Sequence, residues 1–327
     1  MEHEPSAAMA MPRIPTCPFI MALHAFTGVQ PPSLTEVLSR MIYGSNMISC
    51  AGGSLTTTYK ICHAVFEERS QVPEEITEND DEYQEITKHL EFRNIPVSPE
   101  RILQSYRETR QHALAAMYLI RKIVLDGHPY DDATFKEAHH ILTYKIDIDI
   151  EPRNPGTVYS GEYRQSLDMR FLEPVEIPTA MFRMIADLIV YQSQPIHGDA
   201  YRRICSATEF CHRFNMIRPF QDGNGRMHRL FLTTLLLRAG ICPAVYGLYA
   251  FDRFQYSQVE SGCYRPGNQG LIREENVIAF ETNLRLAKFV LDHIHGGWDS
   301  PADHMNTFLQ VTCPRLHDPS SSRMEPE

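Results

Sequence analysis

The stretch Phe214-Asn-Met-Ile-Arg-Pro-Phe-Gln-Asp-Gly-Asn-Gly-Arg-Met-His-Arg229 decides the fold of this chain. It places a glycine-rich loop between two segments with helical periodicity. Gly223 and Gly225 allow a tight backbone with positive φ, so the loop N–H groups, including that of Asn224, can face a ligand. The helix that follows adds the positive end of its dipole. The stretch therefore predicts an anion site at a helix N-terminus.

Three charged side chains give this site its chemistry. Arg226 and Arg229 are three positions apart, so they share one helix face and can clamp phosphate oxygens. Asp222 lies where a hard cation such as Mg²⁺ could bridge to the phosphates. We therefore predict phosphate recognition, with Asp222 as the metal ligand.

The same stretch resembles the signature of Fic-domain proteins, His-Pro-Phe-x-Asp/Glu-Gly-Asn-Gly-Arg-x-x-Arg. Every fixed position matches except the first, where Arg218 stands in place of the histidine. In the protein adenylyltransferases of that family, the histidine takes the proton from a target hydroxyl as it attacks the α-phosphate of a nucleotide, usually ATP. Arginine side chains have a pKa above ~12 and do not accept a proton in proteins. The resemblance thus implies an intact phosphate site and altered or lost AMP transfer.

Arg218 could serve the phosphate site in other ways. It could add a third cation there, or stabilise charge on a leaving group. A replacement base could be His212 or His228, although a histidine on a helix face more often has a structural or solvated role. We take Arg218, Asp222 and Asn224 as candidate catalytic residues. The candidate nucleotide-binding residues are Gly223, Asn224, Gly225, Arg226, Arg229, Gly161 and Tyr163.

Two upstream segments extend the resemblance over residues 100–295. Ala138-His139-His140-Ile141-Leu142 is similar to the family's Leu-His-x-x-Leu helix. Ser160-Gly161-Glu162-Tyr163-Arg164 is similar to its flap, Pro-Gly-x-Tyr/Phe-Arg, without the proline. In the family this hairpin lies over the nucleotide and pairs with an extended target by strand addition. The resemblance thus implies a protein acceptor that docks on the flap near Gly161.

The segment Tyr43–Gly52 resembles the inhibitory helix of many Fic proteins, Ser/Thr-x-x-x-Glu-Gly/Asn. Ser45 stands at its first position and Ser49 at the glutamate position. A serine cannot form the salt bridge that the glutamate makes with the second motif arginine. We therefore expect Arg229 to be free. Tyr256 fits either a nucleotide pocket or the core.

Helical periodicity in nearly every patterned segment predicts an all-α, Fic-fold helical bundle, with one small β-hairpin at residues 157–164. We expect a loose N-terminal segment (1–32), a helical region with an acidic insertion (33–98), a Fic-like domain (99–295) and a disordered tail (296–327). Within the domain, Asp132 and Asp199 are the expected N-caps of two helices.

Composition narrows the partners and the compartment. The net charge of −10 argues against non-specific binding to nucleic acid or to an anionic membrane. The eight cysteines have no zinc-ligand spacing, so we expect reduced thiols. The longest late apolar stretch, Leu230–Leu237, is far shorter than the ~20 residues of a membrane span. With no signal-peptide pattern, we expect a cytoplasmic or nuclear protein.

Three functions remain open from the sequence. The first is a Fic-like transferase that uses a phosphate-containing donor, such as a nucleotide with Mg²⁺, and a protein or small-molecule acceptor. The second is a pseudoenzyme that binds a nucleotide or a protein partner without transfer. The third is an enzyme of this fold with a non-nucleotide, small-molecule biosynthetic substrate.

Overall fold

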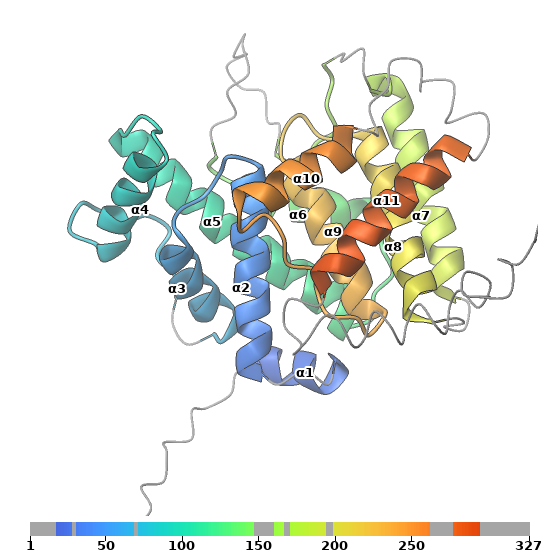
Figure 1. The fold of residues 1–327 in the computed structure, drawn as a ribbon, viewed down its shortest axis with the longest axis horizontal. Helices are drawn as coiled ribbons and strands as arrows, with labels where there is room; N and C mark the ends of the chain where they lie inside the picture. Colours follow the sequence, from blue (N-terminus) through green and yellow to red (C-terminus); the bar gives the residue numbers. More distant parts are fainter. Residues whose placement is uncertain are drawn as a thin grey trace, which may run out of the picture.

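A computed structural model describes residues 18–27, 31–68, 71–146, 160–166, 171–193, 199–261 and 277–294. Within these residues the regular structure is helical and no sheet forms, so the all-α prediction is confirmed (Figure 1). The predicted hairpin begins before residue 160, in a segment outside the described residues. The tail at 296–327 also lies outside them.

The N-terminal half contains α1 (Pro18–Thr27), α2 (Pro31–Ile48), α3 (Leu55–Phe66), α4 (Asp81–Phe92), α5 (Pro99–Leu119) and α6 (Asp132–Thr143). A π-helical segment, Ile120–Leu125, continues α5. The C-terminal half contains α7 (Ile177–Ser193), α8 (Ala200–Ile217), α9 (Asn224–Arg238), α10 (Ala250–Ser261) and α11 (Val277–Ile294). No helix in these described ranges has both the length and the hydropathy of a membrane span.

Side-chain caps fix where the central helices begin. Ser98 Oγ accepts from Arg101 N at the start of α5, at 3.2 Å. Asp199 Oδ1 accepts from Arg202 N at 2.9 Å, which confirms that N-cap. The predicted cap of α6 is wrong by one residue, because Asp131 has the extended backbone that a cap requires and accepts from the N–H of Thr134, the third residue of the helix.

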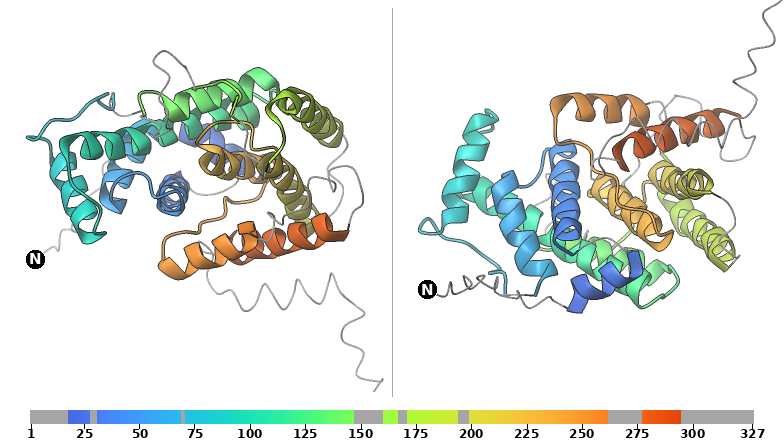
Figure 2. Two further views of the ribbon diagram at one scale, coloured as in Figure 1. Left: turned by 90° about the horizontal axis from the view of Figure 1, so that it is seen from above. Right: turned by 60° about the horizontal axis from the view of Figure 1, so that its bottom comes forward.

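Helix α9 is the core of the molecule. Nearly all of its side chains are buried, from Asn224 to Leu237. Helices α2, α5, α6 and α8 pack around it, and α10 and α11 cross in front of it in Figure 1 and lie along one side of the molecule in both views of Figure 2. A helix that is buried on all sides needs no polar face. The buried N-terminal turn of α9 is therefore held rigidly at the loop that the sequence singled out.

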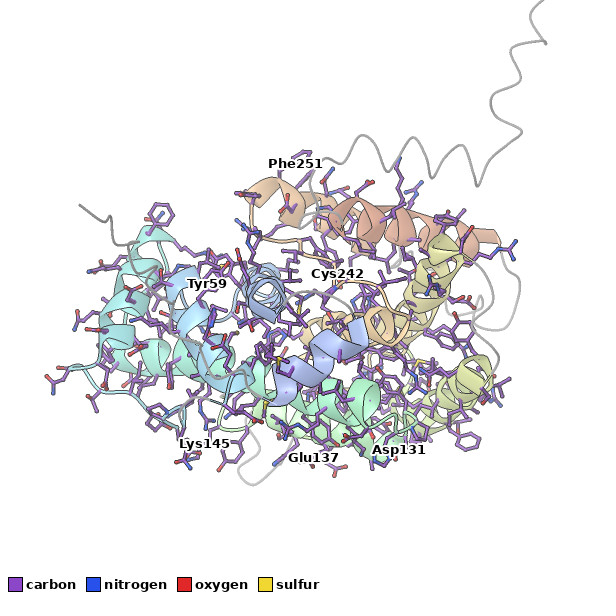
Figure 3. The ribbon with its side chains drawn as sticks, turned by 90° about the horizontal axis from the view of Figure 1, so that it is seen from below. Tyr59, Asp131, Glu137, Lys145, Cys242 and Phe251 are labelled. Carbon is purple, nitrogen blue, oxygen red and sulfur yellow. The ribbon has the colours of Figure 1, made fainter. Side chains whose placement is uncertain are left out.

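Three helices were not predicted. Part of the supposedly loose segment 1–32 forms α1, which buries Phe19, Ile20 and Leu23. Part of the acidic insertion forms α4, which buries apolar residues at helical spacing (Tyr83, Ile86 and Leu90). The third is α10, which turns Tyr256 into the core and exposes Phe251, as Figure 3 shows. In α4 and α10 a few apolar contacts outweigh an otherwise polar composition, whereas α1 is itself mostly apolar.

Candidate functional site

The loop between α8 and α9 is closed by its own side chains. Arg218 ends α8 with a left-handed backbone (φ 46°, ψ 65°), and its N–H donates to Phe214 O at 3.0 Å. Asn224 then holds both main-chain groups of Phe220: its Oδ1 accepts from N at 2.9 Å and its Nδ2 donates to O at 2.6 Å. The side-chain amide of Asn224 is thus used inside the loop. Its backbone N–H, in the first helical turn, remains for a ligand.

The two motif glycines have different reasons to be glycine. Gly223 has φ +73°, as predicted, and forms the N-cap of α9. Gly225 lies within the helix and does not have positive φ, so that prediction is wrong. A Cβ there would stand 3.2 Å from Arg229 Nη1. Gly225 is therefore the position over which the Arg229 guanidinium folds back toward the helix N-terminus.

His139 on α6 joins the loop to the segment that follows the predicted hairpin turn. Its Nδ1 accepts from Gly161 N at 2.9 Å, so its Nε2 carries the proton and donates to Asp222 O at 3.0 Å. Its ring stacks on Phe220 with centroids 3.8 Å apart. Burial is the main reason that the pKa of His139 is lowered to about 4. The neutral ring therefore fixes two backbone segments at once.

The predicted flap residues run beside the motif loop. Tyr163 forms an antiparallel bridge with Phe220, and Arg164 N donates to Pro219 O at 2.9 Å. Arg164 Nε donates to Arg218 O at 2.8 Å. Gly161 has φ +79°, as its place at the predicted turn requires. The structure thus brings Gly161, Tyr163 and the motif loop together.

The first motif arginine is buried and incompletely paired. Arg226 is 4% exposed, and its Nη2 lies 3.6 Å from Asp222 Oδ2. Its Nη1 is buried without a hydrogen-bond partner. The Asp222 side chain is 53% exposed, so its carboxylate compensates this cation only weakly.

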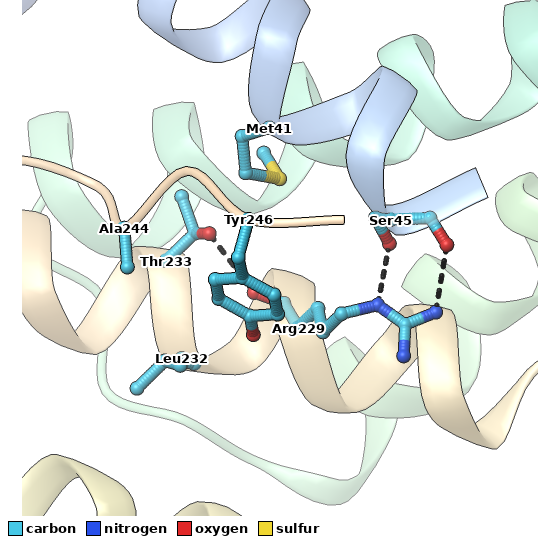
Figure 4. Close-up of a pocket in the computed structure, with 7 residues that line it drawn as sticks. All are labelled: Met41, Ser45, Arg229, Leu232, Thr233, Ala244 and Tyr246. Atoms are coloured by element: carbon cyan, nitrogen blue, oxygen red, sulfur yellow. Dashed lines mark hydrogen bonds between the residues drawn. The ribbon is translucent and has the colours of Figure 1, made fainter. Parts of the chain in front are cut away.

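The second motif arginine is not free, which corrects the prediction. Arg229 Nε donates to Ser45 Oγ at 2.7 Å, and Nη2 donates to Ser45 O at 2.9 Å (Figure 4). Nη2 also donates to Ser49 Oγ. The motif register of Ser45, on α2, and Ser49, which directly follows α2, therefore places both at Arg229. Neutral oxygens satisfy these N–H groups without a salt bridge. The cavity beside the Arg229 stem is about 10 Å³, room for about one water.

These features agree with the comparisons to known proteins. The model of the Fic/DOC family matches residues 129–236, which contain the flap residues, the loop and nearly all of α9. Residues 129–236 therefore match a Fic/DOC family domain. Among curated proteins, no match is found.

Solved structures of Fic proteins share the fold. A Fic-domain-containing signalling protein from Bacteroides thetaiotaomicron is 14% identical, with a TM-score of 0.51 over 85% of this chain and 96% of that one. A variant of Fic-1 from C. elegans is 14% identical, with a TM-score of 0.53 over 90% of this chain and 72% of that one. At this identity the likeness concerns the fold alone.

Within the Fic/DOC domain, Arg218 has structural partners. Its guanidinium lies over the ring of Phe171, 4.7 Å from the centroid, and its carbonyl accepts from Arg164. His212 and His228 are both buried, and burial lowers their pKa values to about 4 and about 3. They are neutral core residues without the exposure that a base for an external acceptor needs.

A divalent cation would have one protein carboxylate at this loop. Asp222 is half-exposed beside Arg226, and the described part of the chain contains no group of three His, Cys, Asp or Glu side chains that could hold a metal. One carboxylate still fits Mg²⁺, which keeps several waters and takes its remaining ligands from substrate phosphates. The loop thus fits Mg²⁺ that arrives with a phosphate ligand.

Tyr256 belongs to the core in this structure. It is 1% exposed, stacks on Tyr246 with centroids 5.3 Å apart, and its hydroxyl lies 3.1 Å from His228 Nδ1. Its ring also lies 5.6 Å from the Arg229 guanidinium carbon. Tyr256 therefore packs against the Arg229 guanidinium within the core and does not line an open pocket.

Proposed function

We propose that the Fic/DOC domain binds the phosphates of a nucleotide, such as ATP, with Mg²⁺, and acts as a Fic-type transferase with altered or lost AMP transfer. The observation that carries the proposal is Arg226 Nη1, a buried cationic N–H with no acceptor at the N-terminus of α9. A buried charged donor without a partner is costly, and a phosphate oxygen would satisfy it. The helix dipole favours the same anion.

Each element of the loop has a role in this proposal. Arg226 and the N–H groups of Asn224 and Gly225 hold the phosphates, and Asp222 contributes the protein ligand to Mg²⁺. When bound, Mg²⁺ neutralises phosphate charge. Arg229 would bind the terminal phosphate after leaving its partners Ser45 and Ser49. A protein acceptor would pair with the flap near Gly161–Arg164, next to the loop.

Proton transfer is where this chain departs from the motif. Arginine does not accept a proton, and the two nearby core histidines are buried. The acceptor would then be a group that needs little base assistance, such as an amine or an ionised oxygen.

A binding module without transfer is the second candidate. Two contacts of Arg218 support it: the guanidinium lies over the Phe171 ring, and the carbonyl accepts from Arg164 Nε. Both contacts give Arg218 a structural role. Labelled-nucleotide transfer assays distinguish the two candidates, because both require binding and only the first yields a modified acceptor. For either one we propose the cytoplasm or nucleus as the compartment.

The test is isothermal calorimetry with ATP, ADP and GTP, with and without Mg²⁺. We expect micromolar binding to the wild-type protein that is lost in Arg226→Ala and retained in Arg183→Ala, a matched control on the exposed face of α7. If no nucleotide binds in any condition, the nucleotide proposal fails. A small-molecule substrate of another kind would then account for the orphaned cation.

A further inference from the structure

Ser49 combines an exposed position with contact to a buried cation. It directly follows α2 and is exposed, while its Oγ accepts from Nη2 of Arg229, which is 3% exposed. The chain reverses immediately afterwards: Cys50 has φ +52°, and Ala51 N donates back to Asn46 O at 2.9 Å. Ser49 is therefore an exposed hydroxyl in a turn, and it contacts the second motif arginine, on α9.

Arg229 has an unmet demand for negative charge. Its recorded hydrogen-bond acceptors are two serine hydroxyls and one carbonyl, all neutral. Among the described residues, no carboxylate forms an ion pair with it. A buried guanidinium that is only dipole-paired would gain from a true anion in bidentate geometry. An anion attached to the Ser49 oxygen would stand at the right place without moving α2.

A second arginine contacts the residue that follows Ser49. Arg101 Nη2 donates to the carbonyl of Cys50 at 3.2 Å, so its charge is next to the same turn. The carboxylate that pairs with Arg101, Glu108, is already engaged by Gly52 N at 2.6 Å and lies 3.6 Å from Arg101 Nη1. Two arginines around one exposed hydroxyl form the charge arrangement that receives a phosphoryl group.

We propose that Ser49 is a phosphorylation site, and that its phosphoryl group pairs with Arg229 and keeps the terminal phosphate of a nucleotide out of the site. In the step, a protein kinase uses a nucleoside triphosphate as donor. Ser49 Oγ forms a bond to the γ-phosphorus, the bond from that phosphorus to the bridging oxygen breaks, the diphosphate leaves, and the hydroxyl proton goes to the kinase base. The exclusion of the terminal phosphate rests on the proposed nucleotide site. The pairing of the phosphoryl group with Arg229 rests on the Ser49–Arg229 contact.

The first experiment installs phosphoserine at position 49 during translation and compares the protein with wild type, Ser49→Ala and the neutral Ser49→Gln. Calorimetry then measures ATP and AMP. We expect phosphoserine to weaken ATP at least ~10-fold and AMP less than ~2-fold, because AMP lacks the phosphates that would reach Arg229. Unchanged ATP affinity in the phosphorylated protein would overturn the proposal.

Thermal unfolding of the same variants distinguishes a failure of this proposal from a failure of the proposed nucleotide site. Phosphoserine at position 49 should raise the unfolding temperature above that of Ser49→Gln, and the gain should vanish in an Arg229→Gln background. If phosphoserine raises the unfolding temperature but no variant binds a nucleotide, the pairing with Arg229 is supported and the proposed nucleotide site is wrong. Equal unfolding temperatures for phosphoserine and glutamine overturn the contact.

The modification itself is read by mass spectrometry of the full chain recovered from eukaryotic cells treated with a phosphatase inhibitor. Trypsin releases the peptide Met41–Lys60, which contains Ser45, Ser49 and Ser54. We expect phosphate on Ser49 and none on Ser45, which is 2% exposed. A peptide phosphorylated elsewhere and never at Ser49 would rule out Ser49 as the site.

Discussion

The α8–α9 loop and the α2–α9 contact flank the same two arginines, yet they are built in different ways. The loop is cross-bonded by Asn224 and His139, whose side chains hold main-chain groups. The α2–α9 contact holds Arg229 through neutral oxygens of Ser45 and Ser49. Main-chain anchoring makes a rigid anion site, whereas a few neutral hydrogen bonds make a contact that a stronger anion can replace.

Acid should weaken the loop that His139 holds, and it also acts on the α2 side, where burial lowers the pKa of His112, whose Nδ1 lies 2.7 Å from Asn46 Oδ1. The pKa of His139 is about 4 in the folded chain and about 6.5 when exposed, so the unfolded chain binds the proton first. Its stabilising contribution is complete above pH 6.5 and is lost as the pH falls to about 4, about 3 kcal/mol in total. Urea unfolding from pH 7.5 to 4 measures this. The same arithmetic applies to the buried His212 and His228, which steepens the whole acid transition.

The His139→Asn variant isolates its share. It should be less stable than wild type at pH 7 but lose less stability between pH 6.5 and 4. The exposed His128→Asn serves as the control. A His139→Asn curve parallel to that of wild type would show that His139 is not the neutral clamp described above.

Removing the Asn224 side chain, which holds the loop, should lower the free energy of unfolding nearly as much as protonation of His139 does. Asn224→Ala leaves the buried N–H and C=O of Phe220 without partners, so we expect a loss of about 2–3 kcal/mol in the free energy of unfolding. Chemical denaturation checks this, with the exposed Gln255→Ala as the control. A loss below about 0.5 kcal/mol in Asn224→Ala would mean that the loop does not depend on this side chain.

The buried half of the α2–α9 contact should contribute less. Ser45→Ala removes the hydroxyl that accepts from Arg229 Nε, while the Ser45 carbonyl keeps its own bond. We expect a loss of about 1.5 kcal/mol in unfolding free energy, the lower end for a hydrogen bond to a charged group. A loss that exceeds that of Asn224→Ala would reverse the ranking of the two regions.

The exposed half should contribute least. Ser49→Ala is expected to lower the free energy of unfolding by less than about 1 kcal/mol, because water can replace the hydroxyl at an exposed position. The same denaturation series measures it beside Ser45→Ala. If Ser49→Ala is the more damaging of the two, the contact is not replaceable in the way that we infer.

The sequence predicted the parts that depend on local spacing. It gave the left-handed Gly223, the Asp199 cap and the register that puts Ser45 and Ser49 at Arg229. It missed the clamp role of His139, because the partners of that ring lie 22 and 83 residues away. It missed α10 because the few core contacts of that helix are tertiary and leave only a weak local pattern. It missed α1 because the Pro-, Ala- and Met-rich composition of residues 1–32 masks the helical spacing of Phe19, Ile20 and Leu23.

The error at Arg229 has a chemical cause. We had equated the absence of a glutamate with a free arginine, but hydroxyl and carbonyl oxygens are sufficient acceptors at close range. Gly225 differs from the prediction for a similar reason. This glycine leaves space for the Arg229 guanidinium and does not supply backbone freedom.

The central claim is that the phosphate half of the motif is complete and the proton-transfer half is missing. The most direct test is AMP transfer from labelled ATP by Arg218→His, on a protein shown to be folded and nucleotide-bound. We predict transfer raised by at least ~10²-fold over wild type, the lower end of what a general base supplies. A folded, ATP-bound Arg218→His protein with no more transfer than wild type would contradict the claim.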